Sequence, residues 1–147
     1  MLVAMETSGA IVGALGSSGA PAISVDLQRP EHDGPSYQGD VRDVIPLRHW
    51  RIIFFVGPNC FQHMRRDHLT LEDKIQDCRA YWGGAMVLWC LATPHATTVL
   101  VEQPDTIVYD FVKLGSRTDV QVHELRTSQT GDRSDKFLRL ADRKSVV

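Results

Sequence analysis

The stretch that decides the fold is W-R-I-I-F-F-V-G-P-N-C, residues 50–60. Its apolar run, Ile52–Val56, lies between a charged residue and the pair Gly57-Pro58, which predicts a buried central strand of a parallel sheet. In open α/β sheets, ligands bind just beyond the carboxyl ends of such strands. The turn carries Asn59 and Cys60 to that position, so Cys60 is a candidate nucleophile. A cysteine that packs as a small apolar residue is the alternative.

Length and composition are those of an ordinary globular domain. The chain has 147 residues, of which 43% are hydrophobic and 23% are charged. We therefore expect a single domain over residues 1–147, with the last few residues, in A-D-R-K-S-V-V, frayed. The formal net charge of −2 gives no broad attraction to nucleic acid, so any such contact has to be local or supplied by a partner.

The cysteines and the N-terminus bear on the compartment. The chain has three cysteines, widely spaced and without a C-x-x-C pair, which predicts neither a zinc site nor a disulfide framework and fits a reducing compartment. The N-terminus lacks a basic segment followed by a long apolar run, so no signal peptide is expected. No stretch approaches the roughly 18 apolar residues of a membrane span.

The first residues predict a strand, a turn and a helix. Leu2–Met5 is apolar and is followed by E-T-S-G-A-I-V-G-A-L-G, a small-residue turn into a helix of the kind that holds nucleotide cofactors. The G-x-G-x-x-G spacing is missing, so a tight turn with a packed small-residue helix is an equal alternative. A second strand, Ala22–Val25, leads to Asp26, which could accept hydrogen bonds from ribose hydroxyls or serve as a turn residue.

A polar segment separates this unit from the central strand. Residues Gln28–Gln38 contain two prolines and show no periodicity, which predicts a loop. Asp40 follows in G-D-V-R-D-V-I, a turn that runs into a pair of valines with amphipathic spacing. Its carboxylate could bind a purine amino group or cap a helix.

A basic loop and a long helix are expected after the central strand. The loop F-Q-H-M-R-R-D-H-L, residues 61–69, is either solvated or in contact with phosphate. Its histidines lack partners at ligand spacing, so no metal site is predicted. Thr70, with an acidic residue three positions on, indicates a capping box at the start of a helix that reaches Leu91, broken at most at Gly83-Gly84. This helix would bury Cys78 and Cys90 on its apolar face.

The last third of the chain predicts strands again. The β-branched segment Thr97–Val101 leads to Glu102, which would share a cleft with the central strand's turn if the two strands are neighbours. A short helix is expected over Thr106–Val112. The alternating segments Val120–Leu125 and Lys136–Leu140 flank a polar turn, which predicts a β-hairpin.

A series of motifs now resembles a known family. E-T-S-G, S-V-D-L, Y-Q-G-D-V-R-D-V, a strand into G-P-N-C, and V-L-V-E-Q-P follow one another over residues 2–112. Their order and spacing resemble those of small phage-type proteins related to DNA cytosine-5 methyltransferases, with a weaker similarity in G-D-R-S-D-K-F-L-R-L. The resemblance implies an α/β fold: a Rossmann-like methyltransferase-type sheet, mainly parallel, with helices on both faces and a C-terminal antiparallel hairpin. It also implies S-adenosylmethionine as cofactor.

The resemblance assigns the cofactor-binding residues. Thr7, Ser8 and Gly9 match the loop that cradles S-adenosylmethionine. Asp26 matches the acidic residue that binds the cofactor's ribose, and Asp40 the one that binds its adenine amino group.

The resemblance also assigns the reaction. Cys60 would add to carbon 6 of a cytosine flipped out of DNA, and Glu102 would hydrogen-bond ring nitrogen 3 and absorb the developing charge. The family has Pro-Cys and Glu-Asn-Pro where this chain has Pro58-Asn59-Cys60 and Glu-Gln-Pro. Either Asn59 has replaced the nucleophile and Cys60 is a bystander, or the loop is shifted by one residue. No separate target-recognition domain and no counterpart of the family's arginine motif are evident.

Two functions follow as expectations. The first is an S-adenosylmethionine-dependent, cytosine-5 DNA methyltransferase-like protein acting on DNA, with a protein partner or a second copy supplying target recognition. The second is a catalytically silent methyltransferase-like binding or structural subunit, for example of a viral particle. An NAD-type oxidoreductase is disfavoured because G-x-G-x-x-G is missing. The expected location is the cytoplasm, that of the host if the protein is viral, or the virion, without membrane contact.

Overall fold

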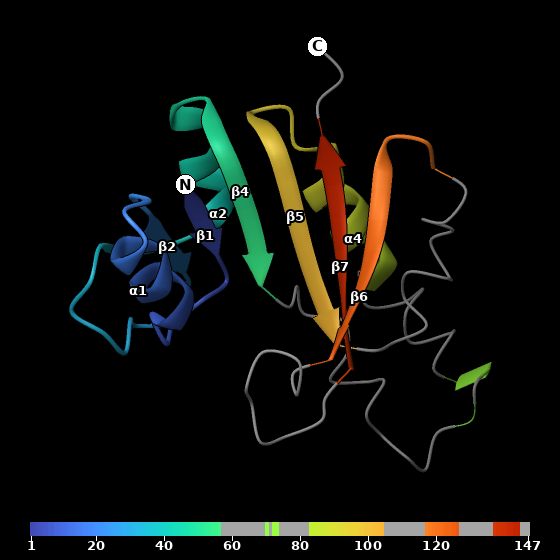
Figure 1. Cartoon of the computed structure of the whole chain (residues 1–147), viewed down its shortest axis with the longest axis horizontal. Helices are drawn as coiled ribbons and strands as arrows, with labels where there is room; N and C mark the ends of the chain where they lie inside the picture. Colours follow the sequence, from blue (N-terminus) through green and yellow to red (C-terminus); the bar gives the residue numbers. More distant parts are fainter. Residues whose placement is uncertain (57–69, 71, 74–82, 105–116, 127–136, 145–147) are drawn as a thin grey trace.

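One sheet of seven strands organises the chain, in the order β3-β2-β1-β4-β5-β7-β6 (Figure 1). The structure, a computed structural model, describes residues 1–56, 70, 72–73, 83–104, 117–126 and 137–144. Strands β1 to β5 are parallel to one another, whereas β7 is antiparallel to both β5 and β6. The strands are β1 Leu2–Ala4, β2 Ile23–Asp26, β3 Ser36–Gln38, β4 Trp50–Val56, β5 Ala96–Pro104, β6 Val120–Arg126 and β7 Phe137–Lys144.

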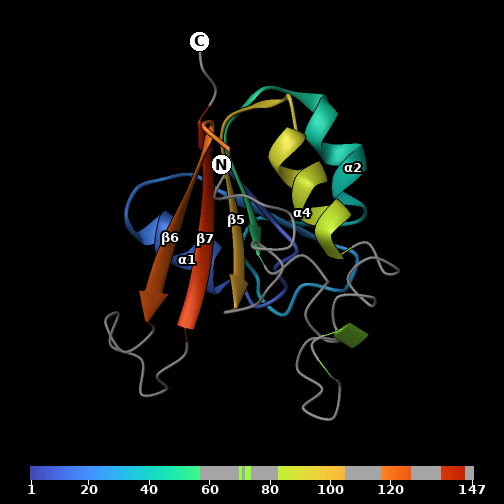
Figure 2. The same ribbon diagram turned by 90° about the vertical axis from the view of Figure 1, so that its right-hand side faces the viewer.

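Helices cover both faces of the sheet. Helix α1, Ala10–Ser17, lies on one face, and the helices α2, Val41–Val44, and α4, Gly83–Ala92, lie on the other (Figure 2). A 3-10 turn, η1, Ile45–Leu47, continues α2. Among the described helices, none is long and apolar enough to cross a membrane. The expected architecture, a mainly parallel α/β sheet with a C-terminal antiparallel hairpin, is confirmed.

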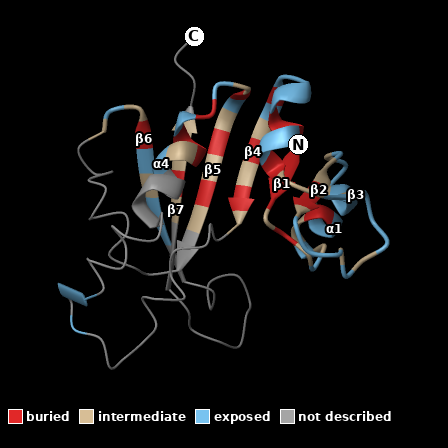
Figure 3. Cartoon of the chain, turned by 180° about the vertical axis from the view of Figure 1, so that it is seen from behind, coloured by how far each residue is buried: buried red, intermediate tan, exposed pale blue. Residues whose placement is uncertain are grey.

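The core lies between the central strands and the layer of α2 and α4. Ile53 and Phe55 of β4 are fully buried and alternate with half-buried neighbours, as the red and tan bands of Figure 3 show. The Phe55 ring meets the edge of Trp89 from α4, with ring centroids 6.0 Å apart. The register places fully buried residues of the adjacent strands beside them on this face: Leu2, Ala4, Val99 and Val101. The run at 52–56 is apolar throughout because helices cover parallel sheets on both faces.

Two parts of the predicted layout are wrong. The Gln28–Gln38 segment is not entirely loop, because Ser36–Gln38 forms edge strand β3 parallel to β2. A strand this short and this polar gives no alternating pattern. The tail is not frayed from Ala141 onward, since β7 continues to Lys144 by pairing with β5 through Thr98↔Lys144. Both segments owe their structure to a neighbouring strand.

Several elements match their predictions with shifted bounds. The β6–β7 hairpin pairs antiparallel as expected, and the small-residue helix after Gly9 is α1. Thr70 caps as predicted: its hydroxyl accepts from the Asp73 backbone N–H at 3.2 Å. Cys90 is buried. The predicted helix over Thr106–Val112, the basic loop 61–69, Cys78 and most of the segment between Thr70 and Gly83 lie outside the described residues.

Candidate functional site

The strand order reverses between β1 and β4. From β1 the chain builds outward through β2 to β3, and then returns to the other side of β1 to build β4 and β5. Such a switch point separates the connections at the carboxyl ends of the two central strands and leaves a crevice where ligands bind. Ala4 of β1 pairs with Phe55 of β4, so both strands end close to one level. The candidate site therefore begins at the loop after Ala4.

The chain leaves β1 through a strained residue. Met5 has φ 66°, in the left-handed region, and its N–H donates to the Val25 carbonyl oxygen at 2.7 Å. A left-handed conformation costs a non-glycine residue about 1–2 kcal/mol. Strain of this kind is concentrated at functional sites, where the surrounding structure holds it in place. The bend at Met5 directs the next residues across the end of the sheet.

Glu6 organises the loop that follows. Its side chain is 6% exposed, and its Oε1 accepts from the backbone N–H of Ile11 at 2.7 Å and from the hydroxyl of Ser8 at 3.3 Å. The carboxylate thus satisfies an otherwise unpaired N–H at the positive end of α1. The second oxygen, Oε2, is buried and has no hydrogen-bond partner among the described residues. Leaving a buried carboxylate oxygen unpaired is costly, so this atom is suited to accept from a bound ligand.

Sequence reasoning passed over Glu6, although a signal was present. An acidic residue just before a small-residue helix is a helix-start pattern. Glycine follows at Gly9, where φ is 72° and the residue precedes the first turn of α1. A Cβ at Gly9 would lie 2.3 Å from Cγ of His32, so only glycine fits there without displacement. Both the charge of Glu6 and the missing side chain of Gly9 shape the predicted cofactor loop, Thr7–Gly9.

Asp26 is the last residue of β2. It is half-buried, and its Oδ1 accepts from the Gln28 backbone N–H at 2.8 Å, while its own carbonyl oxygen accepts from Gly39. Asp26 therefore acts as a turn residue, one of the two roles expected from the sequence. A carboxylate has about four acceptor positions, so this turn leaves capacity for ligand hydroxyls. The next side chain, Leu27, is 70% exposed and presents an uncovered apolar surface beside the carboxylate.

Asp40 follows β3 and caps α2. Its Oδ1 accepts from the Arg42 backbone N–H at 2.8 Å, and the Arg42 Nε lies 3.0 Å from both carboxylate oxygens. Hydrogen bonds from the Arg42 side chain, more than its charge, hold the pKa of Asp40 below its usual range. The helix-cap alternative is confirmed. The contact with a purine amino group stays a prediction.

The structure describes one member of the predicted catalytic pair, Glu102. β4 and β5 are parallel neighbours as expected, and Val56, the last residue of β4, pairs with Glu102 of β5. Glu102 is half-buried, and its strand continues to Pro104, beyond the predicted end, because β7 pairs along it. Asn59 and Cys60 lie outside the described residues. Their roles, and their distances to Glu102, stay predictions.

The structure brings the predicted cofactor residues to one edge of the sheet. Thr7–Gly9, Asp26 and Asp40 follow the carboxyl ends of β1, β2 and β3, which are adjacent and parallel. Within the described ranges, no group of three or more histidine, cysteine or acidic side chains is arranged to hold a metal ion. This edge of the sheet therefore carries the carboxylates of Asp26 and Asp40 beside the loop Thr7–Gly9.

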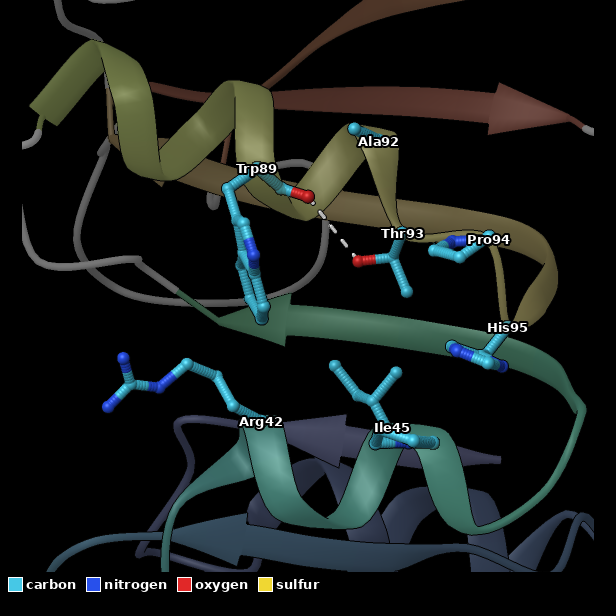
Figure 4. A pocket seen from close by; sticks show the side chains of 8 residues that line it. Arg42, Ile45, Trp89, Ala92, Thr93, Pro94 and His95 are labelled. Atoms are coloured by element: carbon cyan, nitrogen blue, oxygen red, sulfur yellow. Dashed lines mark hydrogen bonds between the residues drawn. The ribbon is translucent and has the colours of Figure 1, made fainter.

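A hollow lies between two of the helices that cover the sheet. It follows the seam between α2 and the end of α4, where Arg42, Trp89 and His95 are among the lining side chains (Figure 4). The Thr93 hydroxyl donates to the Trp89 carbonyl oxygen at 3.4 Å and fixes the turn at one end. Arg42 belongs to both places, but its guanidinium is engaged with Asp40. None of the predicted site residues lines this seam.

Comparison with known proteins identifies the fold. No protein-family model and no curated protein matches the chain. Among solved structures, the methyltransferase domain of METTL16 superposes with a TM-score of 0.56 at 7% identity, covering 99% of this chain and 74% of that one. The S. pombe Dnmt2 methyltransferase gives 0.52 at 12% identity over 98% and 50%, and the 23S rRNA methyltransferase ErmE gives 0.52 at 9% over 99% and 61%.

The matched structures are mostly longer than this chain, which spans 34% of WbdD and 50% of Dnmt2. Almost the whole of this chain is nevertheless used in each superposition. At such low identities the likeness shows the fold alone. The chain has the fold of the methyltransferases.

Proposed function

We propose that this chain binds S-adenosylmethionine at the carboxyl ends of β1, β2 and β3. The observation that carries the proposal is the convergence of Thr7–Gly9, Asp26 and Asp40 on adjacent strand ends beside the switch point. The methyltransferase fold supports it. The buried, unpaired Oε2 of Glu6 also fits a cofactor that carries hydrogen-bond donors.

Each residue of the site has a defined part in this proposal. Asp26 accepts from the ribose hydroxyls, and Leu27 covers an apolar face of the adenine. Asp40 accepts from the adenine amino group with acceptor capacity that its carboxylate has beyond the bonds from Arg42. Glu6 Oε2 accepts from the ammonium of the methionine part, a charge-assisted contact. When bound, S-adenosylmethionine supplies an electrophilic methyl group.

The proposed reaction is methylation of cytosine at carbon 5. The Cys60 thiolate adds to carbon 6 of the flipped base, and Glu102 hydrogen-bonds ring nitrogen 3 so that the ring accepts the electron pair. The pairing of Val56 with Glu102 supports this assignment, because the sequence G-P-N-C, for which a turn is predicted, follows Val56 directly in the chain. Both groups then come from adjacent parallel strands at the edge that holds the cofactor residues.

A catalytically silent binding protein is the second candidate. The observation that favours it is Asn59, which stands between Pro58 and Cys60 where the family has proline directly before cysteine. An amide at the nucleophile's position cannot form the covalent adduct. A misplacement of about 1 Å can already cost on the order of a hundredfold in rate. The fold and the cofactor site would be retained in such a protein.

Calorimetric titration with S-adenosylmethionine and S-adenosylhomocysteine tests cofactor binding. We expect both to bind to the wild type, and we expect unchanged binding to Asp43→Ala, a control at an exposed carboxylate on the helix that Asp40 caps. Wild-type protein that binds neither compound would refute the proposed function.

Covalent trapping separates the two candidates. Duplex DNA that carries a mechanism-based cytosine analogue is incubated with wild type and with Cys60→Ser in the presence of S-adenosylmethionine. A denaturation-resistant complex with wild type alone identifies the methyltransferase. Cofactor binding without a complex in either protein identifies the silent form.

A further inference from the structure

The connection between β2 and β3 packs against the predicted cofactor loop. The Glu31 backbone N–H donates to the Thr7 carbonyl oxygen at 2.9 Å, which joins the two loops directly. A Cβ placed on Gly34 would lie 4.0 Å from Val12, a buried residue of α1. We call residues 31–34 the strap. It lies beside α1 at the start of the cofactor loop.

His32 is the side chain of the strap that contacts the loop. Its ring lies against Gly9, where a Cβ would come within 2.3 Å of Cγ and 2.6 Å of Cδ2. Its Nδ1 accepts from the Gly34 N–H at 3.0 Å, and its Nε2 lies 3.1 Å from the hydroxyl of Ser24. Ser24 is 1% exposed in β2. The ring is thus held by a buried strand residue and by its own loop, with Gly9 against it.

The hydrogen-bond network assigns the tautomer of His32. A backbone N–H can only donate, so Nδ1 must be the accepting nitrogen. The neutral ring then carries its proton on Nε2 and donates it to Ser24 Oγ. Both ring nitrogens are therefore hydrogen-bonded in one orientation of the ring, and these two bonds fix that orientation.

We propose that His32 is a positioning residue for the cofactor: it holds the Thr7–Gly9 loop in the conformation that receives S-adenosylmethionine. This inference rests on the proposed function. His32 does not replace a cofactor-binding residue; it acts through Gly9 and, via the strap, through the Thr7 carbonyl oxygen. Glu6 holds the two ends of the loop through Ser8 and Ile11, and His32 adds the contact at Gly9. The strand that precedes the loop, β1, has only three residues and ends at the strained Met5. Without the ring, the loop regains conformational freedom that cofactor binding must remove.

A double-mutant cycle tests the contact. In the wild type, Gly9→Ala drives a methyl group into the ring and must shift the ring or the loop. In the His32→Ala background the ring is gone, and only the Cβ at position 32, 2.8 Å from the new Cβ, is left to meet it. The clash is then smaller, and the cost of the left-handed backbone at Gly9 is the same in both backgrounds. We expect Gly9→Ala to lower both Tm and S-adenosylhomocysteine affinity more in the wild type than in His32→Ala. Equal effects in both backgrounds would overturn the proposal.

Affinity measured with a stability control separates positioning from packing. We expect His32→Ala to weaken S-adenosylhomocysteine binding about tenfold, the effect of one lost hydrogen bond in affinity. His32→Asn keeps an acceptor near the Nδ1 position for Gly34 and should recover part of that loss. Val99→Ala, a core truncation on β5, should lower Tm without changing affinity measured well below Tm. An affinity loss in Val99→Ala equal to that of His32→Ala would overturn the proposal.

NMR of the imidazole tests the hydrogen bonds that the proposal assigns to the ring. Long-range ¹H–¹⁵N spectra of the apoprotein near neutral pH should show His32 with its proton on Nε2, and the signal should persist with S-adenosylhomocysteine bound. A ring protonated on Nδ1 would overturn the assignment and the proposal with it. Wild type that fails to bind refutes the proposed function, whereas wild type and His32→Ala that bind equally well refute this inference alone.

Discussion

The two halves of the sheet are built differently. The half that carries the predicted cofactor residues has short strands, β1, β2 and β3, of three, four and three residues. The half beyond the switch point has β4, β5, β7 and β6, of seven, nine, eight and seven residues. Short strands make few ladder hydrogen bonds, so side chains hold the loops of the first half. Glu6, His32, Asp26 and Asp40 all do so.

The difference in strand length separates the part of the sheet that contributes most to the stability of the fold from the part proposed to bind the cofactor. The long-strand half buries the large side chains Phe55, Ile53, Val99 and Val101. The short-strand half also buries Leu2, Val3 and Val25, but its polar groups lie at the strand ends, where each contributes little to stability. Substitutions of these polar residues should therefore change mainly ligand affinity, with small effects on unfolding free energy, whereas truncation of large buried side chains should change unfolding free energy.

The largest expected effect is that of Phe55→Ala. The ring is fully buried against Trp89, so its removal leaves a cavity and should lower the free energy of unfolding by about 3–5 kcal/mol. Urea denaturation measures the change. Phe54→Ala, on the same strand but half-buried, is the matched control and should cost less. Equal losses for the two variants would contradict the assigned facing of β4.

Asp26→Ala should have the next largest effect, on affinity. Loss of the carboxylate that accepts from ribose hydroxyls should weaken S-adenosylhomocysteine binding by roughly 1.5–3 kcal/mol. Calorimetry measures this against the exposed control Asp43→Ala. Asp26→Asn keeps an acceptor for the Gln28 N–H and separates the turn from the ligand contact. Full affinity in Asp26→Ala would remove the residue from the cofactor site.

Asp40→Ala should cost about 1 kcal/mol of unfolding free energy through the lost helix cap. The folded-state pKa of Asp40 is lowered, so its contribution is present above the unfolded pKa of about 3.9 and is lost as pH falls through the folded value. Urea denaturation at neutral pH and at about pH 3 measures the difference. A cost for Asp40→Ala that grows on acidification would contradict this assignment.

The smallest effect is expected for Gly39→Ala. The new Cβ would lie 2.4 Å from Cε1 of Tyr37. Tyr37 is 50% exposed on edge strand β3, so its ring can turn away, and the cost should be about 0.5–1 kcal/mol. In a Tyr37→Ala background the same change should be neutral or stabilising. The Tm values of the wild type, the two single variants and the double variant show whether the cost of Gly39→Ala depends on the Tyr37 ring.

Much of the long-strand half could be predicted from local patterns. Ile52–Val56 is apolar throughout because helices cover its sheet on both faces, and the β6–β7 hairpin alternates around a polar turn. Ends that depend on a partner strand were misjudged. Strand β5 runs past Glu102, and β7 past Leu140, because each supplies the other's hydrogen bonds. The strand propensities of single residues do not indicate how far two paired strands extend along each other.

The sequence indicates where the residues of the candidate site lie along the chain, but not which other residues they contact. Asp26 stands at a strand end that the sequence indicates, and Asp40 at a turn that it indicates. The structure adds that the Arg42 side chain hydrogen-bonds both oxygens of Asp40 and that the Gln28 N–H donates to one oxygen of Asp26. The orphan oxygen of Glu6 could not be predicted, because burial of one carboxylate oxygen depends on the packing of α1 over β1. The role of His32 could not be predicted for the same reason, because its hydrogen-bond partner Ser24 belongs to another element of the fold.

By itself, the sequence determined the central strand, the α/β class, the hairpin and the polar residues that end each strand, because periodicity and turn chemistry act over neighbouring residues. Tertiary structure alone decided the strand order, the existence of β3, the length of β7 and the contact of the His32 ring with Gly9. These features depend on hydrogen bonds and contacts between segments far apart in the chain, and such energies appear only when the partners are brought together.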